Sequence, residues 1–353
     1  MTAPLPAQND RSVPRAGRGM QRGFVLAATL WMLAIMTVAA VYFAGRIQRG
    51  RELAQAAQSH AQALLDLDNA RAEILFRIAT TPFSVYGLGA SANDAIALDD
   101  RPYLEPAGTS IRLQDNRGLL NLNVASDDRL DRFLSVLGAP AARRAALIDA
   151  LRDYIDDDDL KHLNGAEAAD YAALGLPPPR NANLVTPMEA RSVYGWGDVP
   201  ALWQANLLPS LTTTSGTFSL NPNTAPWQVL ATMRGMTPEG AQAIIKARKI
   251  APILNTGQIE ALTGIQISTD PFSADAITFP AESVRVTQQP KGMGWGWQYN
   301  VTLTPVSDTA PWRIDYSYRV ELSSFDAAKQ AVQPLPARAA RTASQPESLV
   351  LSP

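Results

Sequence analysis

The sequence contains no cysteine among its 353 residues and only two histidines, His60 and His162. The lack of cysteine excludes disulfides, thiol catalysis and thiolate metal sites. Two histidines argue against a metal site built from several imidazoles. The formal net charge is −2, so the chain lacks the global basic field that attracts nucleic acid. The length allows one large or two medium domains.

Catalytic motifs are also missing. The sequence has no Gly-x-Ser-x-Gly element and no phosphate-binding loop. The glycines of Gly87-Leu88-Gly89-Ala90 do not stand between a predicted strand and a predicted helix. His162 lies near a run of aspartates and could be a base, but a single histidine in an acidic loop is usually only solvated. A membrane-anchored hydrolase is therefore the weakest hypothesis, and a non-enzymatic protein is expected.

One long apolar segment is present near the N-terminus. No Asp, Glu, Lys, Arg or His occurs from Phe24 to Ala44. A helix that spans a bilayer needs about 20 apolar residues, and this run has that length. The positive-inside tendency keeps the N-terminus in the cytoplasm and sends the remaining chain across the membrane. The basic residues that precede the run are Arg11, Arg15, Arg18 and Arg22.

The helical pattern continues beyond the apolar segment. Apolar residues recur at spacings of three and four from Leu53 to Ile78, which is the pattern of one helix face. We predict one helix from Phe24 to Ala79, on the order of 80 Å long. Its transmembrane part is 24–45, and its amphipathic part is 46–80. We expect a sheet to cover the amphipathic part.

The rest of the chain changes character twice. Residues 81–108 are typical of a loop, and Ser110–Gln114 and Leu119–Asn123 alternate polar and apolar residues around a turn, which predicts a hairpin. Helical patterns follow, and strand patterns return at 282–287, 297–303 and 312–321. The expected helices are 127–137, 140–154, 166–174, 187–193, 225–234, 238–249 and 257–262.

These patterns predict an α+β fold in which an antiparallel sheet packs on the long helix. A large all-α insertion would separate the strands. The predicted divisions are a leader at 1–23, a first sheet part at 81–124, the insertion at 125–275, a second sheet part at 276–325 and a disordered tail at 326–353.

The residues at the start of the apolar run form a recognisable signal. A basic leader ends in Gly23, and Phe24 opens the run. This arrangement resembles the type III signal of type IV pilins and type II secretion pseudopilins. The resemblance implies that a membrane peptidase cuts between Gly23 and Phe24 and methylates the new amino terminus. The alternative is a plain signal anchor, in which the pair Gly23-Phe24 occurs by chance.

Several short motifs lie in the predicted helical region. Together with the signal, they resemble the K component of the general (type II) secretion pathway, the largest minor pseudopilin. The sequence departs from that pattern at Ala168, where Asp is usual, and at Ala190, where Leu is usual. The motifs are Tyr154-Ile155-Asp156, Gly165-Ala166-Glu167, Glu189-Ala190-Arg191 and Asn221-Pro222-Asn223-Thr224-Ala225.

This resemblance implies a single-pass protein of the bacterial inner membrane with its C-terminal bulk in the periplasm. Its implied partners are other minor pseudopilins (the I, J and H components), the inner-membrane assembly platform and membrane lipid, with no nucleic acid. Its implied function is to cap or initiate the periplasmic pseudopilus that drives export of folded proteins across the outer membrane.

The acidic run from Asp153 to Asp159 holds five carboxylates in seven positions. Adjacent carboxylates repel unless a cation lies among them, and Ca²⁺ takes six to eight oxygen ligands. The spacing is not an EF-hand, because Leu160 and Lys161 stand where ligand and glycine would be. The residues alone favour a solvated loop, partly neutralised by Lys161 and Arg152.

The family resemblance instead implies Ca²⁺ in this domain. Asp156, Asp158 and Glu167 match the family's ligand positions. The absent acid at Ala168 weakens or removes one site if two exist. Weaker candidates are Asp157, Asp159, Asp170 and Asn183.

A second resemblance covers residues 220–265, which are similar to the helix-hairpin-helix modules of competence DNA receptors. Such a hairpin holds a phosphate with backbone N–H groups. The usual Gly-Ile-Gly turn is replaced by Gly235-Met236-Thr237-Pro238, and Pro238 removes a donor. The basic residues Lys246, Arg248 and Lys249 are more typical of a solvated helix face. A membrane-anchored DNA receptor is therefore the alternative function.

One residue bears on the place of the subunit in a filament. Major pilins and pseudopilins carry Glu at the fifth residue after the cut, where this sequence has Ala28. A carboxylate in hydrocarbon is costly without a partner. A subunit with no neighbour above it gains nothing from Glu, so Ala28 favours the filament tip. The expected contact face toward other subunits holds Leu53, Ala57, Leu64 and Leu75.

Overall fold

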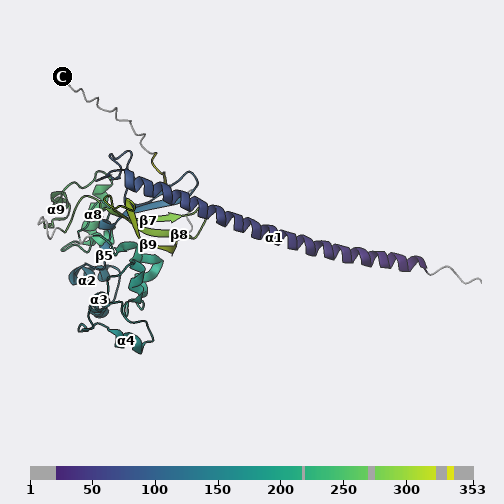
Figure 1. Ribbon diagram of the computed structural model, residues 1–353, viewed down its shortest axis with the longest axis horizontal. Helices are drawn as coiled ribbons and strands as arrows, with labels where there is room; N and C mark the ends of the chain where they lie inside the picture. Colours follow the sequence, from purple (N-terminus) through teal and green to yellow (C-terminus); the bar gives the residue numbers. More distant parts are fainter. Residues whose placement is uncertain (1–20, 217–218, 269–274, 323–331, 338–353) are drawn as a thin grey trace, which may run out of the picture. The chain divides into compact units, whose positions relative to one another are not determined.

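The computed structural model describes residues 21–216, 219–268, 275–322 and 332–337 (Figure 1). The chain divides into two units, residues 1–62 and 63–353. Helix α1 (Gln21–Thr80) begins in the first unit and ends in the second. The long N-terminal helix predicted from the sequence is therefore confirmed.

In the first unit, α1 carries the apolar run without cover from the described part of the chain. Phe24 is 77% exposed, and the other large apolar side chains of the run are exposed as well. Among the described residues, this is the one helix long and apolar enough to cross a bilayer. An uncovered apolar surface of this length fits a single-pass anchor. Arg11, Arg15 and Arg18 of the leader lie outside the described residues.

In the second unit, the end of α1 packs on a sheet. Ala70, Ile74 and Ile78 are buried at spacings of four, and they join one apolar cluster with sheet residues. On the sheet side, Leu113 pairs in register with Val286, which in turn pairs with Tyr299. Alternate residues of a strand face the same side. This alternation lets the sheet present one apolar face to α1.

The sheet has six described strands in the order β10-β3-β4-β7-β8-β9. Its pairs are antiparallel, except that β10 pairs parallel with β3. The sheet is therefore mixed and not purely antiparallel as predicted. The strands are β3 (Asp99–Leu104), β4 (Ser110–Asp115), β7 (Ser283–Gln289), β8 (Trp295–Leu303), β9 (Trp312–Glu321) and β10 (Gln333–Pro334).

The opposite face of the sheet is also covered. Every residue of β7 is buried, including Arg285. The Arg285 guanidinium donates to the backbone carbonyls of Pro209 and Ser210, both at 2.9 Å. These carbonyls belong to α6 (Leu207–Leu211). A buried cation with two acceptors thus joins the sheet to the helical part of the unit.

The helical part lies in the chain between β4 and β7, although these two strands pair directly. It encloses a second apolar core, separate from the cluster under α1. The predicted helices are present within a few residues, and three short helical elements between Pro200 and Leu211 were not predicted. The helices are α2 (Asp127–Val136), α3 (Ala141–Ile155), α4 (Ala168–Ala173), α5 (Pro200–Trp203), α6, α7 (Trp227–Leu230), α8 (Pro238–Arg248) and α9 (Thr256–Thr263), with 3₁₀ turns η2 (Pro187–Ser192) and η3 (Gln204–Asn206).

Three predictions about strands fail. The expected hairpin of Ser110–Gln114 with Leu119–Asn123 is absent, because the turn η1 (Asn116–Gly118) leads instead to β5 (Leu120–Asn121), which pairs parallel with β6 (Thr212–Thr213). The presumed loop 81–108 contains β3 and the short strands β1 (Phe83–Ser84) and β2 (Gly87–Leu88). Within the presumed disordered tail, residues 332–337 are described and include β10.

Two segments a hundred residues apart share one local structure. Repeat 1 begins Leu120-Asn121-Leu122-Asn123-Val124-Ala125, and repeat 2 begins Leu220-Asn221-Pro222-Asn223-Thr224-Ala225. In both, the first Asn side chain accepts the N–H of the second Asn at 3.0 Å. In both, its backbone carbonyl accepts the N–H of the Ala at 3.0 Å. We define repeat 1 as residues 120–155 and repeat 2 as residues 220–248.

The side chain of the second Asn of each turn forms hydrogen bonds with the backbone of a segment that is distant in the sequence. Asn123 accepts from the N–H of Leu184 at 2.9 Å and donates to its carbonyl at 3.0 Å. Asn223 accepts from the N–H of Ile253 at 2.7 Å and donates to its carbonyl at 2.9 Å. Each carboxamide presents an acceptor and a donor side by side, so it imitates a strand neighbour, and the same Nδ2 group also donates to the carbonyl of Thr214 or of Thr278 at 3.1 Å.

The similarity continues through the helices that follow. Each turn leads into a helix, then a glycine with positive φ, then a second helix. These glycines are Gly138 at +82° and Gly235 at +79°. From the second helix, Arg152 donates to the carbonyl of Ala125, and Arg248 donates to that of Ala225 at 2.6 Å. The helical part therefore contains an internal repeat.

Candidate metal centre

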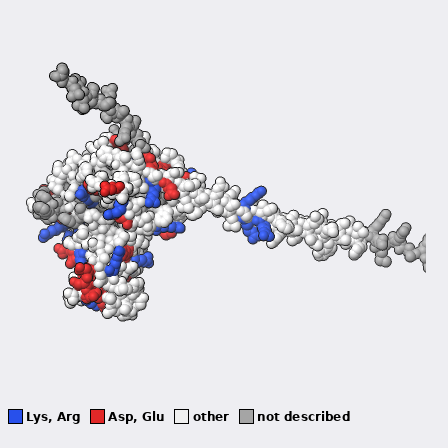
Figure 2. Space-filling view, in the orientation of Figure 1, with Lys and Arg blue, Asp and Glu red and all other residues white. Residues whose placement is uncertain are grey.

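The acidic run begins inside a helix and ends in a loop. Helix α3 extends to Ile155, so Asp153 lies in its last turn, where it is fully buried at 0% exposure. Asp156 is half-buried, and Asp157, Asp158 and Asp159 are exposed. Figure 2 shows the resulting patch of acidic side chains over the part of the molecule that holds α3 and α4.

His162 folds back on Asp153. Its backbone N–H and its ring Nδ1 lie 3.0 and 2.5 Å from Asp153 Oδ1. This hydrogen bond raises the pKa of the His162 imidazole above its ordinary value. The sequence suggested a solvated histidine. In the structure, His162 is instead paired with Asp153. Asp153, Asp156 and His162 each place a possible ligand atom within 4.8 Å of the others.

Several oxygen atoms around this point are buried and accept no hydrogen bond from the described residues. An ionised carboxylate can only accept, and burying it without a partner is costly. Asp153 and Asp156 bring carboxylate oxygens within 4.8 Å of each other, so one cation would serve both of these residues. The buried oxygens are Asp153 Oδ2, Asp156 Oδ1, both carboxylate oxygens of Glu167, and Asn181 Oδ1.

The pKa values point to the same crowding. Burial first, and then the charges of Asp158 and Asp153, raise the pKa of Asp156. Burial first, and then Asp153, Asp156, Asp159 and Asp158, raise the pKa of Glu167. The loop therefore brings Glu167 back to the acidic run. Like charges without a counter-ion push these groups toward the protonated form.

A glycine makes room for the buried carboxylate. A Cβ atom at Gly165 would lie 1.8 Å from Asp153 Oδ2. No side chain can occupy that position unless Asp153 moves. The Gly165-Ala166-Glu167 step thus lets the loop close over Asp153 and turns Glu167 inward. This contact gives the glycine of the motif a physical role.

The weaker candidates have different fates. Asp170 pairs with Lys161 at 2.8 Å and accepts the N–H of Glu167 at 2.9 Å, and the Lys161 bond lowers its pKa. Asp170 therefore positions Glu167 and is already neutralised. Asp158 Oδ1 accepts the N–H of Leu160 at 2.7 Å, which leaves its other oxygen for a ligand role.

Asn183 is exposed, whereas Asn181 lies beside the cluster. Asn181 donates to the carbonyl of Asp158 and to Asp159 Oδ1, at 3.1 and 3.2 Å, and its own Oδ1 is one of the buried unpartnered oxygens. The sequence pointed to Asn183, whereas in the structure Asn181 is the asparagine that contacts the acidic run. The signal that marks Asn181 is its positive φ of 49°, which only the structure reveals.

Repeat 2 has a different polar centre at its start. Asp115, at the end of β4, is fully buried. Its carboxylate accepts from Asn221 at 2.9 Å, from Thr224 at 2.8 Å, and from the backbone N–H groups of Arg117 and Ala281 at 3.0 and 2.9 Å. The Asn-x-Asn-Thr-Ala motif therefore attaches repeat 2 to the sheet through hydrogen bonds to Asp115. Burial raises the pKa of Asp115, and these bonds oppose the rise.

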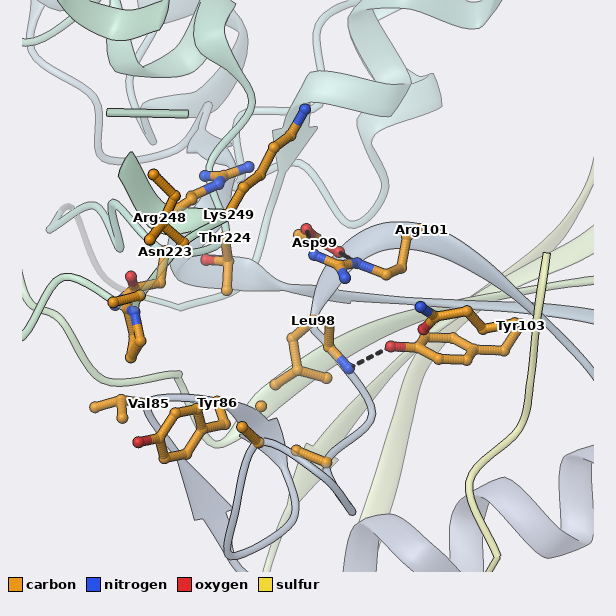
Figure 3. A pocket seen from close by; sticks show the side chains of 18 residues that line it. Val85, Tyr86, Leu98, Asp99, Arg101, Tyr103, Asn223, Thr224, Arg248 and Lys249 are labelled. Carbon is orange, nitrogen blue, oxygen red and sulfur yellow. Dashed lines mark hydrogen bonds and ion pairs between the residues drawn. The ribbon is translucent and has the colours of Figure 1, made fainter. Parts of the chain in front are cut away.

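The basic residues of repeat 2 border a pocket of about 580 Å³. Figure 3 shows Arg248 and Lys249 on one side of it, with Asp99, Arg101 and Tyr103 of β3 on another. Arg248 is committed to the carbonyls of Pro222 and Ala225, at 2.8 and 2.6 Å. Arg101 is paired with Asp99 through two bonds of 2.7 and 2.6 Å. These internal bonds weaken the case for a phosphate-binding hairpin.

The remaining sequence candidates lie on α1. Phe24 is exposed, and Gly23 belongs to the first turns of the helix. Leu53 is 73% exposed, Leu64 is 41% exposed and Ala57 is also exposed, so all three can face a partner. Leu75 is only 8% exposed and belongs to the cluster under α1. Its assignment to a partner surface was wrong, because the chain's own sheet covers it.

Comparison with known proteins places this architecture. Two family models, both described as type II secretion system (T2SS), protein K, match residues 111–214 and 220–278. The chain belongs to the protein K family of the type II secretion system. The boundary between the two matches lies just before the turn of repeat 2. The protein is thus a minor pseudopilin of that system.

A solved structure shares the fold of this protein K family member. It is described as the crystal structure of the GspK-GspI-GspJ complex from the enterotoxigenic Escherichia coli type 2 secretion system. The match has a TM-score of 0.51 at 17% identity, and it covers 76% of this chain and 99% of that chain. No curated protein sequence matches the chain.

Proposed function

We propose that this protein K family member is a non-enzymatic subunit that caps or initiates the periplasmic pseudopilus, and so supports export of folded proteins across the outer membrane. The observation that carries the proposal is the pair of protein K matches over adjoining segments, 111–214 and 220–278. The exposed apolar half of α1 supports an inner-membrane anchor, with the second unit in the periplasm.

The proposed partners are the other minor pseudopilins, the I, J and H components, together with the assembly platform. The solved neighbour is itself a complex of GspK with GspI and GspJ. The contact face would hold Leu53, Ala57 and Leu64, which are exposed on α1. Apolar side chains at helical spacing suit packing against another long helix.

The tip position rests on Ala28 and on the helical part of the second unit. Ala28 cannot pair with the amine of a subunit above it. The helical part, which we interpret as an insertion of helix-hairpin-helix or SAM-like type, adds bulk that a tightly packed shaft would not accommodate. Both features suit a subunit with neighbours on one side only.

We further propose that the acidic centre binds Ca²⁺. The residues that would hold it are Asp153, Asp156 and Glu167, with Asn181 and Asp158 at the margin. The support is the set of buried oxygens without donors and the approach of Asp153, Asp156 and His162 to within 4.8 Å of one another. Oxygen-only ligands on a loop suit this hard cation. Bound Ca²⁺ would tie the end of α3 to the start of α4.

Processing between Gly23 and Phe24 completes the proposal. A small residue is needed before the cut, so Gly23→Val should leave the full-length chain in the membrane. Intact mass spectrometry of membrane-extracted protein measures this directly. A mature wild-type protein that begins upstream of Phe24 would contradict the pilin-type signal.

The assembly role is tested by co-expression of the full chain with I and J components, followed by purification in detergent. We expect a complex with about one copy of each. Leu64→Asp should abolish it, because a buried unpaired charge costs several kcal/mol. Leu160→Asp is the matched control, since Leu160 is exposed in the acidic loop.

The same preparation distinguishes the alternative function. Retention of duplex DNA by wild-type protein, without association with I and J components, would favour a DNA receptor. Association that survives Leu64→Asp would reject the proposed face but leave the assembly role standing.

A further inference from the structure

A cavity of about 290 Å³ lies between α1 and the sheet of the second unit. Leu64 and Leu67 line it from the helix, and Trp297 of β8 lines it from the sheet. Leu64 is 41% exposed and Trp297 is 37% exposed, so apolar side chains stand at the exposed rim of the cavity. Leu64 also belongs to the contact face proposed for α1. The cavity is therefore continuous with that face.

Two buried polar side chains line the same cavity. Tyr299 is 2% exposed and Gln288 is 1% exposed. The Tyr299 hydroxyl and the Gln288 Nε2 group have no hydrogen-bond partner among the described residues. Gln288 pairs with Trp297, and Tyr299 lies two residues further along β8, so all three share the sheet face toward α1. Burial raises the pKa of Tyr299, so its hydroxyl keeps the proton and remains a donor.

The charged residues of the cavity balance each other. Asp68 and Arg71 both line it from α1, and both are exposed. The Arg71 guanidinium lies over the Tyr299 ring, 5.4 Å from its centroid, in a cation–π contact. One anion and one cation leave no net charge, so the cavity favours neither a carboxylate nor an ammonium group. The group that suits it is neutral and carries an acceptor oxygen for the two buried donors.

A carboxamide meets these requirements. Its oxygen has two lone pairs, so it can accept from the Tyr299 hydroxyl and from Gln288 Nε2, and its NH₂ group offers donors to Asp68. Because the cavity adjoins Leu64, the subunit that packs on that face is the one that can supply the group. We infer that the cavity receives an Asn or Gln side chain from the long helix of a neighbouring minor pseudopilin, an inference that rests on the assembly role proposed for this protein.

Such a contact selects the neighbour. Long helices with similar apolar patterns all fit an apolar face, so that face alone discriminates little among them. A neighbour with an apolar side chain at this point would seal the donors of Tyr299 and Gln288 away from any acceptor, which is costly. Specificity gained by penalising the wrong partner is a common feature of interfaces. The cavity thus decides which subunit lies beside α1.

Removal of one donor tests the inference in the full chain, purified in detergent and titrated with the I and J components. Tyr299→Phe deletes only the hydroxyl, so it should raise the dissociation constant about fivefold, as for the loss of one neutral hydrogen bond. The melting temperature of the free subunit should stay the same or rise, because an unpaired buried donor is removed. Weaker binding together with a lower melting temperature would assign the hydroxyl a structural role and overturn the inference.

Tyr316→Phe is the matched control. The Tyr316 hydroxyl is also buried and without a partner among the described residues, but Tyr316 pairs with Asn300 and so lies on the opposite sheet face from Tyr299. This variant should leave the dissociation constant unchanged. Equal constants for wild type and Tyr299→Phe would show that water alone serves the donor, which overturns the inference and leaves the assembly role standing. A wild-type chain that forms no complex would contradict the assembly role, and the inference with it.

A photo-crosslinking amino acid in place of Ser317, an exposed residue of the cavity, identifies the occupant. We expect crosslinks to a helical peptide of the I or J component that contains Asn or Gln. Replacement of that residue by Leu should weaken the complex as much as Tyr299→Phe does, and the two changes together should weaken it no further. Crosslinks only to lipid or to a second copy of this chain would overturn the inference. So would a loss for Tyr299→Phe that disappears at high salt, because a neutral contact is not screened.

Discussion

Repeat 1 and repeat 2 have the same turn, the same glycine between helices and the same arginine reaching back to the turn, yet opposite charges follow their second helices. Repeat 1 leads into the acidic loop with its unpartnered oxygens. After its second helix, repeat 2 continues with Lys249 and no acidic run, and Arg248, the last residue of that helix, donates to two carbonyls. The two repeats share their turn and helices, and they differ in the charge of the segment that follows the second helix.

The attachment of the two repeats differs as well. The first Asn of repeat 1, Asn121, donates to the backbone carbonyl of Gly216 at 3.1 Å. The first Asn of repeat 2, Asn221, donates to the buried carboxylate of Asp115. Two donors from repeat 2, Asn221 and Thr224, bond to the Asp115 carboxylate, and bonds to a charged acceptor are stronger than the bond of Asn121 to a neutral carbonyl. Repeat 1 is therefore the one freer to respond to a ligand.

The largest expected effect comes from breaking the stronger attachment. Asp115→Ala leaves four buried donors without an acceptor, at about 1–3 kcal/mol each when unsatisfied. We expect a loss on the order of 4 kcal/mol in the free energy of unfolding, measured by denaturant titration. Asp127→Ala is the control, because Asp127 makes an exposed pair with Arg152. Equal losses for the two variants would contradict the special role of Asp115.

The next effect should belong to repeat 1 alone. Ca²⁺ at 100 times its Kd should stabilise the protein by ~2.7 kcal/mol. Asp156→Ala and Glu167→Ala should remove the difference in melting temperature between Ca²⁺ and chelator. Glu239→Ala, an acid at the start of α8 in repeat 2, should keep it. Identical melting curves for wild type in both conditions would reject the site.

A third test asks whether the two turns are equivalent. Asn123→Ala and Asn223→Ala each leave a backbone N–H and a carbonyl without their partner, beside buried Leu184 and Ile253. We expect similar losses of about 2 kcal/mol in both variants. The measurement is thermal unfolding in chelator, so that the metal does not enter. If the losses of the two variants differed by more than about 2 kcal/mol, the two turns would be alike in shape but not in their contribution to stability.

The pH dependence of stability should change sign with Ca²⁺. In chelator, Asp156 and Glu167 have raised pKa values, so the folded state holds more protons than the unfolded state above about pH 4. The free energy of unfolding should then fall as pH rises through that window. Ca²⁺ binds the ionised forms, so stability should rise with pH in its presence.

The comparison for this test is Asp156→Asn combined with Glu167→Gln, which imitates the protonated state. This variant should lose both slopes in the same titration. A wild-type slope that is unchanged by Ca²⁺ would show that no metal competes with protons at these carboxylates.

The smallest effect is expected at the basic end of repeat 2. Lys249 is exposed. Lys249→Glu should change the free energy of unfolding by less than about 0.5 kcal/mol, as surface substitutions usually do. It should also leave the response to Ca²⁺ unchanged. If Lys249→Glu gained a new response to Ca²⁺, one added carboxylate would be sufficient for binding, and the folded acidic loop after α3 would not be required.

Much of the fold follows from the sequence because its signals are local. The helix from Gln21 to Thr80 has uninterrupted helical spacing, and strands such as Trp312–Glu321 alternate clearly. The strand Asp99–Leu104 was missed because it contains Asp, Arg and Pro102, and Asp100 has a positive φ of 65°. Its conformation depends on β4 beside it. The false hairpin failed for the same reason, since Leu120–Asn121 pairs with a strand near residue 212.

The candidate site was predictable in composition but not in geometry. The aspartate run and Glu167 stand out in the sequence, and the structure brings them together. Asp153 becomes important because it occupies the inward side of the last turn of α3. Asn181 becomes important because the chain returns there after Pro177–Pro179. The internal repeat was visible only as two similar hexapeptides, and its hydrogen bonds were needed to identify it.

The direct pairing of β4 with β7 has a consequence for how the protein folds. Asp115 and Ala281 are joined by a hydrogen bond although they are 166 residues apart. Contacts between such distant residues slow folding, because the entropy of closing the loop is lost before the contact forms. The apolar face of α1 and β4 must therefore wait for the last third of the chain. During that interval the nascent subunit is exposed to aggregation and proteolysis, and a chaperone that holds extended apolar segments should raise its yield.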